Sequence, residues 1–307
     1  MWGVSNVING VALAMAPFAG SSRWLVAPLV AAALYDGLRG FWQLVMVAGM
    51  RRWRDLVPVL RWRPGTADAL ASALAGGPLA TGCFFLSIAF AGVTYGVAVS
   101  ATVPVFGALW GILFLKDRLC RLGWAGLLLV VAGAVVVSYR APEGAHPHFY
   151  LGVFFGVLTA LGWSFEGLFA KRAMRHLTPT AVNTTRQVGS FLAFVCVLLP
   201  AVGGLDLLGT AFTRPSALVV LGAAAAGSAG YLLYFTSVDR IGPGRAMPLN
   251  LTYVLWTAVL GLALLNEPFT WQLGVGALAV VGGAWLVVRG ERGARAADDV
   301  ARLSEMR

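Results

Sequence analysis

An acidic side chain inside an apolar segment is the residue of this sequence best placed to do chemistry. Glu166 lies in the apolar run 150–170, and no basic residue stands three or four positions from it. Trp163 lies one helical turn away on the same face. A carboxylate supplies charge, and an indole face adds cation–π attraction of up to about 2 kcal/mol when desolvated. The pair is typical of a site for a small organic cation, although an ion pair with Arg186 or an extension toward Lys171 stays open.

Three more charged residues lie within apolar segments. Asp36 and Arg39 share one segment, three positions apart, so they can pair on a helix. Arg186 lies in another segment, and Asn183-x-x-Arg186 repeats the spacing of Asp36-x-x-Arg39. Charges within a bilayer are costly unless they pair or face a water-filled cavity. With Glu166 the four charges sum to zero, so they are candidates for ion pairing or for coupling, with Arg186 tuning the acidity of Glu166.

Aromatic residues at helical spacing add to the candidate site. Asn250, Tyr253 and Trp256 fall at i, i+3 and i+6, near one face of a helix. Tyr231 and Tyr234 are one turn apart in the preceding segment. The alternative is simple packing. As a site, they predict that Asn250 orients a hydroxyl and that an aromatic cage surrounds the ammonium, formed by Trp163, Tyr231, Tyr234, Tyr253 and Trp256.

The segments that must position these residues are long and apolar. The chain of 307 residues is 59% hydrophobic and 12% charged, with a mean hydropathy of +0.78. A soluble domain has about twice that charged fraction, and about 20 apolar residues suffice to cross a bilayer. The sequence predicts an all-α membrane protein with ten transmembrane helices at about 2–20, 24–49, 67–89, 95–115, 121–139, 150–170, 178–201, 214–237, 244–265 and 271–288.

Basic residues indicate how these helices are oriented. If the N-terminus is inside, nearly every loop Arg or Lys falls on the inner side, and only Arg23, Arg140 and Arg214 fall outside. Cytoplasmic loops of membrane proteins carry this excess. We therefore expect a multi-pass protein of the cytoplasmic membrane with both termini in the cytoplasm. The net charge of +10 follows from this topology and needs no nucleic-acid partner.

An internal duplication divides the chain. Residues 82–139 repeat without a gap 150 positions later, and Gly126/Gly276 and Gly133/Gly283 coincide, as do Asp117 and Glu267. The predicted organisation is a first five-helix repeat over 1–139, a linker over 140–149, a second repeat over 150–289 and a polar tail over 290–307. Five helices is an odd number, so the second repeat is inverted. Inverted repeats are typical of secondary transporters, with the site near the bilayer midplane.

Other classes of function find little support. The sequence shows no metal-ligand spacing, no cofactor motif and no nucleophile with a base, so we expect neither an enzyme nor a bound metal or cofactor. A scaffold gains nothing from an acid inside a membrane. The expected partners are the lipid bilayer, a small-molecule substrate and protons, and both a monomer and a homodimer stay open. Pro78, Pro104 and Pro248 are expected to bend or break their helices.

Several motifs resemble a known family. Ten spans in two halves, with the acidic ends Lys116-Asp117-Arg118-Leu119 and Asn266-Glu267-Pro268, resemble the drug/metabolite transporter superfamily, EamA type. A narrower set is similar to the LicB-type choline permease branch: Gly76-Gly77-Pro78-Leu79, Gly162-Trp163-Ser164-Phe165-Glu166-Gly167, Arg186-Gln187, Tyr231-Leu-Leu-Tyr234 and Asn250-Leu-Thr-Tyr253-Val-Leu-Trp256.

This resemblance implies uptake of choline or a related quaternary amine by alternating access. A proton gradient or the membrane potential would drive it. The alternative within the superfamily is an exporter of amino acids, drugs or other metabolites.

Overall fold

The structure is a computed structural model, and it describes residues 1–115, 121–138, 147–241, 250, 253–265 and 270–305. These residues form helices and turns, with no strand among them. Asp117, Glu267, Pro248 and most of the predicted linker 140–149 lie outside the described residues.

The first half of the chain forms the helices that precede the linker. They are α1 (Trp2–Leu13), α2 (Val26–Gly49), α3 (Val57–Leu60), α4 (Thr66–Leu74), a π-helical segment (Ala75–Thr81), α5 (Gly82–Ala91), α6 (Val93–Ser100), α7 (Val103–Leu115) and α8 (Arg121–Ser138). The second half comprises α9 (Phe149–Ala173), α10 (Pro179–Ala193), a π-helical segment (Phe194–Leu198), α11 (Leu199–Val202), α12 (Leu205–Phe212), α13 (Pro215–Ile241), α15 (Tyr253–Leu265) and α16 (Trp271–Glu305).

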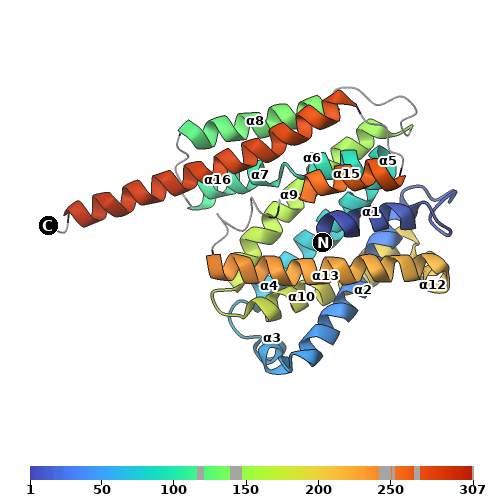
Figure 1. Ribbon diagram of the computed structural model, residues 1–307. Coiled ribbons are helices and arrows are strands. Elements are labelled where there is room, and N and C mark those ends of the chain that lie inside the picture. Colours follow the sequence, from blue (N-terminus) through green and yellow to red (C-terminus); the bar gives the residue numbers. More distant parts are fainter. Residues whose placement is uncertain (116–120, 139–146, 242–249, 251–252, 266–269, 306–307) are drawn as a thin grey trace.

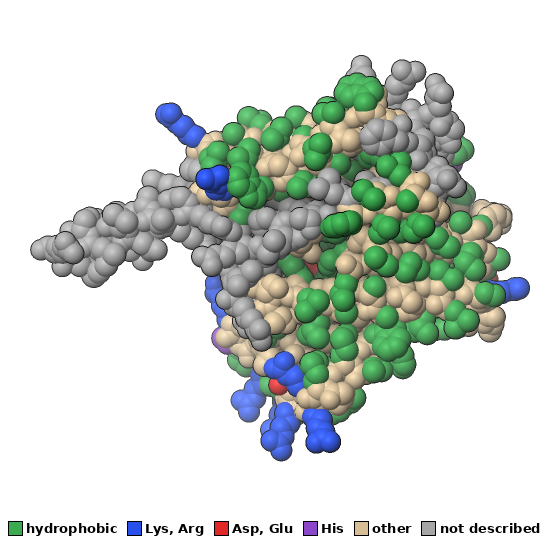
Figure 2. All heavy atoms as spheres, viewed as in Figure 1, with side chains coloured by type: hydrophobic (Ala, Val, Ile, Leu, Met, Phe, Trp, Pro, Cys, Tyr) green, Lys and Arg blue, Asp and Glu red, His purple; other side chains and the backbone are tan. Residues whose placement is uncertain are grey.

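Five helical stretches are long and apolar enough to cross a membrane: Thr66–Ala91, Phe149–Ala173, Pro179–Val202, Pro215–Ser237 and Trp271–Gly290. Each falls on one of the ten predicted spans, and the count of ten stays a prediction. Large apolar side chains on the outer helices are exposed, among them Leu128 on α8 and Leu278 on α16. In Figure 2 hydrophobic side chains cover the described middle of the face, and Lys and Arg stand at its edges. Such a surface suits lipid rather than water.

The helix boundaries differ from the sequence prediction at two prolines. The first helix ends at Leu13 rather than near residue 20, since Pro17 removes an N–H and disfavours helix at the preceding residue. The predicted span 95–115 is interrupted at 101–102, and α7 restarts at Val103 with Pro104 in its first turn, where the missing N–H is harmless. The break expected at Pro104 is therefore confirmed.

Two further boundaries depend on local sequence. Pro78 lies inside the π-helical segment between α4 and α5, where the chain stays helical with altered hydrogen bonding. The polar tail predicted over 290–307 continues α16 as far as Glu305. Its Ala, Arg and Glu residues are good helix formers, which explains this continuation.

Packing between the halves follows the duplication. α8 and α16 lie side by side along one edge of the bundle, and α16 extends beyond it (Figure 1). A Cβ on Gly126 would lie 2.5 Å from the Gly283 carbonyl oxygen, and one on Gly133 would lie 2.7 Å from that of Gly276. Because 126 matches 276 and 133 matches 283 in the duplication, each contact is the counterpart of the other. The two helices therefore cross antiparallel at equivalent small residues.

Other helices also pack against helices of the opposite half. α1 packs against α13 and α15 of the second half, and α9 packs against α5 and α7 of the first. α2, which carries Asp36 and Arg39, and α10, which carries Arg186, pack directly against each other. The halves thus meet along an interface whose middle is polar.

Candidate functional site

Polar side chains on α2 and α10 face each other where these two helices meet. The polar residues of α10 fall at i, i+3, i+4 and i+7, on one buried face: Asn183, Arg186, Gln187 and Ser190. Asn183 Nδ2 donates to Gln43 Oε1 at 3.0 Å, and Ser190 Oγ donates to Asp36 Oδ2. Asp36 matches Asn183 in the repeat, and Gln43 and Ser190 each follow the matched arginine by four positions. The two contacts are therefore equivalent.

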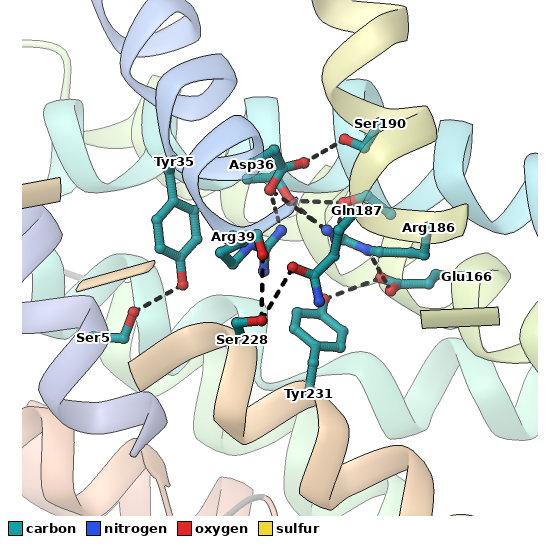
Figure 3. A network of polar contacts seen from close by, with 12 residues as sticks. Ser5, Tyr35, Asp36, Arg39, Glu166, Arg186, Gln187, Ser190, Ser228 and Tyr231 are labelled. Atoms are coloured by element: carbon teal, nitrogen blue, oxygen red, sulfur yellow. Dashed lines mark hydrogen bonds and ion pairs between the residues drawn. The ribbon is translucent and has the colours of Figure 1, made fainter. Parts of the chain in front are cut away.

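Arg186 of α10 contacts α9, α2 and the π-helical segment. Its Nε donates to Glu166 Oε1 of α9 at 2.8 Å, and its Nη1 donates to Asp36 Oδ1 of α2 at 3.4 Å. Its Nη2 donates to the Gly76 carbonyl oxygen at 2.6 Å and to Thr81 Oγ1 at 3.2 Å, both in the π-helical segment. The side chain is fully buried, and each of its three nitrogens has an acceptor. Arg186 thus ties helices of both halves together (Figure 3).

The carboxylate of Glu166 is paired with Arg186, which is the alternative that the sequence left open. Glu166 is 4% exposed, and besides Arg186 it accepts a hydrogen bond from the Tyr231 hydroxyl at 3.4 Å. A Cβ on Gly76 would lie 2.4 Å from Glu166 Cδ, so only glycine admits the acid at this place. The partner comes from the next long helix, twenty positions away, which helical spacing alone does not reveal.

The second ion pair was predicted, and the structure confirms it. Arg39 Nη2 donates to Asp36 Oδ1 within α2. The Arg39 guanidinium carbon lies 4.4 Å from the centre of the Tyr35 ring and 4.8 Å from that of Tyr231. The Arg186 guanidinium lies 4.6 Å from the same Tyr231 ring. The ring predicted to hold a substrate cation therefore holds the protein's own two cations here.

The other predicted cage residues are dispersed around this centre. Tyr234 is half-buried beside Phe235, and Tyr253 lies close to Ser100 and Tyr234. Trp163 packs on Phe84, with ring centroids 5.0 Å apart, and its buried Nε1 has no acceptor in the described part of the chain.

Two predicted residues stand apart from the cage. Trp256 is 63% exposed, so the structure does not bring it into the cage. The Cβ and backbone of Trp256 lie against Gly3 of α1, and the rest of its side chain is turned to the outer surface. Asn250 is helical and half-buried, and its flanking residues lie outside the described part.

Several members of the network were not named in the sequence analysis. They are Tyr35, Thr81, Ser190 and Ser228, while Gly76 and Gln187 appeared there only within the motifs that resemble a known branch. The polar face of α10 was a usable signal, because four strongly polar residues share one stripe of a helix in a predicted membrane span. No comparable signal marked Ser5 as a member of the network. Its hydroxyl lies 2.8 Å from the Tyr35 hydroxyl and donates to the Ala223 carbonyl oxygen at 2.8 Å. Among the described residues, no three His, Cys, Asp or Glu side chains gather in a way that could hold a metal ion.

A helical bundle with an apolar exterior, a repeated architecture and a buried charged centre between the repeats is the arrangement of a membrane transporter. The model of the EamA-like transporter family matches residues 2–139 and 150–289, and this chain belongs to that family. It is an integral membrane protein.

Individual relatives agree with this assignment. The chain is 27% identical to Protein LicB of Haemophilus influenzae over 231 residues, which cover 73% of this chain and 75% of LicB. It is 28% identical to the uncharacterized protein PA1977 of Pseudomonas aeruginosa, over 90% and 92% of the two chains. The uncharacterized transporter YetK of Bacillus subtilis is 23% identical over 68% of this chain. One crystal structure aligns over 94% of this chain with a TM-score of 0.59 and 20% identity, which supports the fold alone.

Proposed function

We propose that this protein is a secondary active transporter that moves a small organic cation, choline or a related quaternary amine, across the cytoplasmic membrane. A proton gradient or the membrane potential drives the movement. The observation that carries the proposal is the group formed by Glu166 and Tyr231, a buried carboxylate and an aromatic ring that together hold guanidinium cations. A group that binds these internal cations has the chemistry to bind an ammonium substrate.

The internal cation suggests how binding couples to movement. Arg186 bonds to residues of α9, α2 and the π-helical segment, so it links helices of both halves. An ammonium that approaches Glu166 and Tyr231 competes with Arg186 for the same charge and the same ring. Once Arg186 is released, the links that it makes are lost, and the halves are free to rearrange. Such a change of partners is what alternating access requires of a site between two repeats.

The proposed topology rests on the duplication and on the glycine contacts between α8 and α16. It has repeats over 1–139 and 150–289, the second inverted, a linker over 140–149, and a cytoplasmic tail over 290–307. Ten membrane spans follow from the apolar runs, and cytoplasmic termini follow from the distribution of basic residues. Antiparallel contact between equivalent glycines supports inversion, because a twofold axis in the membrane plane reverses the direction of each helix.

Transport by the purified protein in liposomes tests this proposal. We expect saturable uptake of radiolabelled choline when a membrane potential, negative inside, or an inward proton gradient is imposed. Unlabelled quaternary amines should compete, and amino acids should not, because the acid and ring favour a weakly hydrated quaternary ammonium, whereas the primary ammonium of an amino acid is strongly hydrated. Liposomes without protein provide the background. Failure of every quaternary amine to be taken up or to compete, with efflux of amino acids or drugs instead, would contradict the proposal and favour an exporter.

A further inference from the structure

The two buried arginines of the network are satisfied to very different extents. Arg186 donates to a carboxylate on each of two helices, to a carbonyl and to a hydroxyl. Arg39 is 1% exposed and donates to one acceptor, Asp36. Its Nε is buried and has no acceptor in the part of the chain that the structure describes. A guanidinium carries five N–H donors, so Arg39 lacks acceptors where Arg186 has them.

Neighbouring groups do not make up this deficit. The rings of Tyr35 and Tyr231 lie against the guanidinium and attract its charge, but a ring face is not the oxygen acceptor that the N–H edge needs. Both oxygens of Asp36 are already in use: Oδ1 accepts from Arg39 and Arg186, and Oδ2 accepts from Ser190. Burying a charged donor without an acceptor costs more free energy than burying a neutral one. The hydrocarbon outside the bundle supplies no water that could accept the hydrogen bond instead.

We infer that Arg39 binds an oxygen acceptor of the substrate, so that the transported amine carries a hydroxyl or carboxylate oxygen in addition to its ammonium group. The inference rests on the proposed function, which places the ammonium at Glu166 and Tyr231. Arg39 and Arg186 both lie against the Tyr231 ring, and the Tyr231 hydroxyl contacts Glu166. The oxygen site and the ammonium site are therefore separated by about one ring, which suits a small molecule with both groups.

This assignment gives Arg39 the role that the sequence suggested for Asn250. The amide of Asn250 was expected to orient a hydroxyl, while Arg39 was expected only to pair with Asp36. Arg39 is the residue of this network whose donors lack acceptors. It becomes the specificity-determining residue for the oxygen.

Three ligands with the same quaternary ammonium chemistry separate the two sites. Choline carries a hydroxyl, glycine betaine carries a carboxylate, and tetramethylammonium carries neither. The dissociation constant of each for the full-length protein can be obtained from thermal stabilisation over a range of ligand concentrations. In the wild type we expect choline or betaine to bind at least about tenfold more tightly than tetramethylammonium, since a hydrogen bond to a charged group contributes at least that much.

The informative variant is the double substitution Asp36→Asn with Arg39→Met. It removes one charge of each sign, keeps one acceptor oxygen, which can serve Arg186, and copies the asparagine that the second repeat has at position 183. We expect the preference for the oxygen-bearing ligand to disappear, while tetramethylammonium binds as in the wild type. Arg23→Gln, which alters an exposed ion pair with Asp206, is the matched arginine control and should keep the preference.

The outcomes separate this inference from the proposed function. If tetramethylammonium binds the wild type as tightly as choline and betaine, or if the preference survives in the double variant, Arg39 does not bind the substrate oxygen, and the proposed function stands. If the three ligands all fail to stabilise the wild type, the proposed function itself fails. Should the double variant be too unstable to measure, Arg39→Met alone replaces it. Asp36 keeps Arg186 as its partner there, methionine has no N–H donor, and an unchanged preference overturns the inference.

Discussion

Replacing Arg186 by methionine should destabilise the folded protein by about 3–5 kcal/mol, the usual cost of removing one partner of a buried ion pair. Methionine keeps much of the apolar stem but leaves Glu166 without its partner and Asp36 with one arginine fewer. It also leaves the Gly76 carbonyl oxygen without the donor that Arg186 supplies. The free energy of unfolding, measured by titration with denaturing detergent against the wild type, gives the effect directly.

Two companion variants show whether charge is the cause. Glu166→Gln added to Arg186→Met removes the uncompensated acid, so the double variant should recover part of the lost stability. Arg23→Met should cost less than about 1 kcal/mol, because the pair between Arg23 and Asp206 is exposed to solvent. A loss for Arg186→Met no larger than that for Arg23→Met would contradict the account of Arg186 as the link between the halves.

The second large effect is expected at Tyr231. Substitution by leucine removes the ring that both the Arg39 and the Arg186 guanidinium lie against. Each cation–π contact contributes up to about 2 kcal/mol when it is desolvated, and both contacts are lost. We expect Tyr231→Leu to lower stability by at least about 2 kcal/mol and to abolish choline uptake. Unfolding and liposome uptake, measured on the same preparation, check both expectations.

Tyr231→Phe separates the ring from its hydroxyl. Phenylalanine keeps both cation–π contacts and loses only the 3.4 Å hydrogen bond to Glu166. It should therefore stay close to the wild type in stability and retain uptake. Equal losses in the phenylalanine and leucine variants would mean that the hydroxyl, rather than the ring face, is what matters at this position.

Five of the ten predicted segments are helical stretches long and apolar enough to cross a membrane, because the signal of an apolar run is local and strong. The duplication also identifies the glycines that meet between α8 and α16. The predicted boundary failed at Pro17, where a helix stops within an apolar run, whereas the break before Pro104 was expected. In both places the backbone limits of proline prevail over hydropathy.

The site could be predicted only as far as it depends on spacing within one helix, because contacts between helices are not encoded in that spacing. Asp36 and Arg39 were paired correctly, since they lie on one helix at a fixed spacing. Glu166 was expected to be unpaired, and Arg186 remained an open alternative, because spacing along one helix says nothing about a neighbouring helix. Trp256 was predicted from periodicity to face the cage, but the packing of α15 turns it outward. The orphan Nε of Arg39 has no signal in the sequence, because it depends on which acceptors the fold brings near.

The central claim is that the buried carboxylate of Glu166 holds the ammonium of the substrate. Equilibrium binding of radiolabelled choline to the purified wild type and to Glu166→Gln tests it most directly. Glutamine keeps the shape and an acceptor for Arg186, which also keeps Asp36 as a charged partner, and the free energy of unfolding is measured alongside binding so that a loss of fold is told apart from a loss of affinity. Asp206→Asn is the matched control, since Asp206 is an exposed acid whose pKa is lowered chiefly by its hydrogen bond to Arg23. We predict saturable binding to the wild type and to the control, and at least about tenfold weaker binding to Glu166→Gln, as expected for losing a desolvated charge. Unchanged affinity in Glu166→Gln would show that the acid only supports the structure.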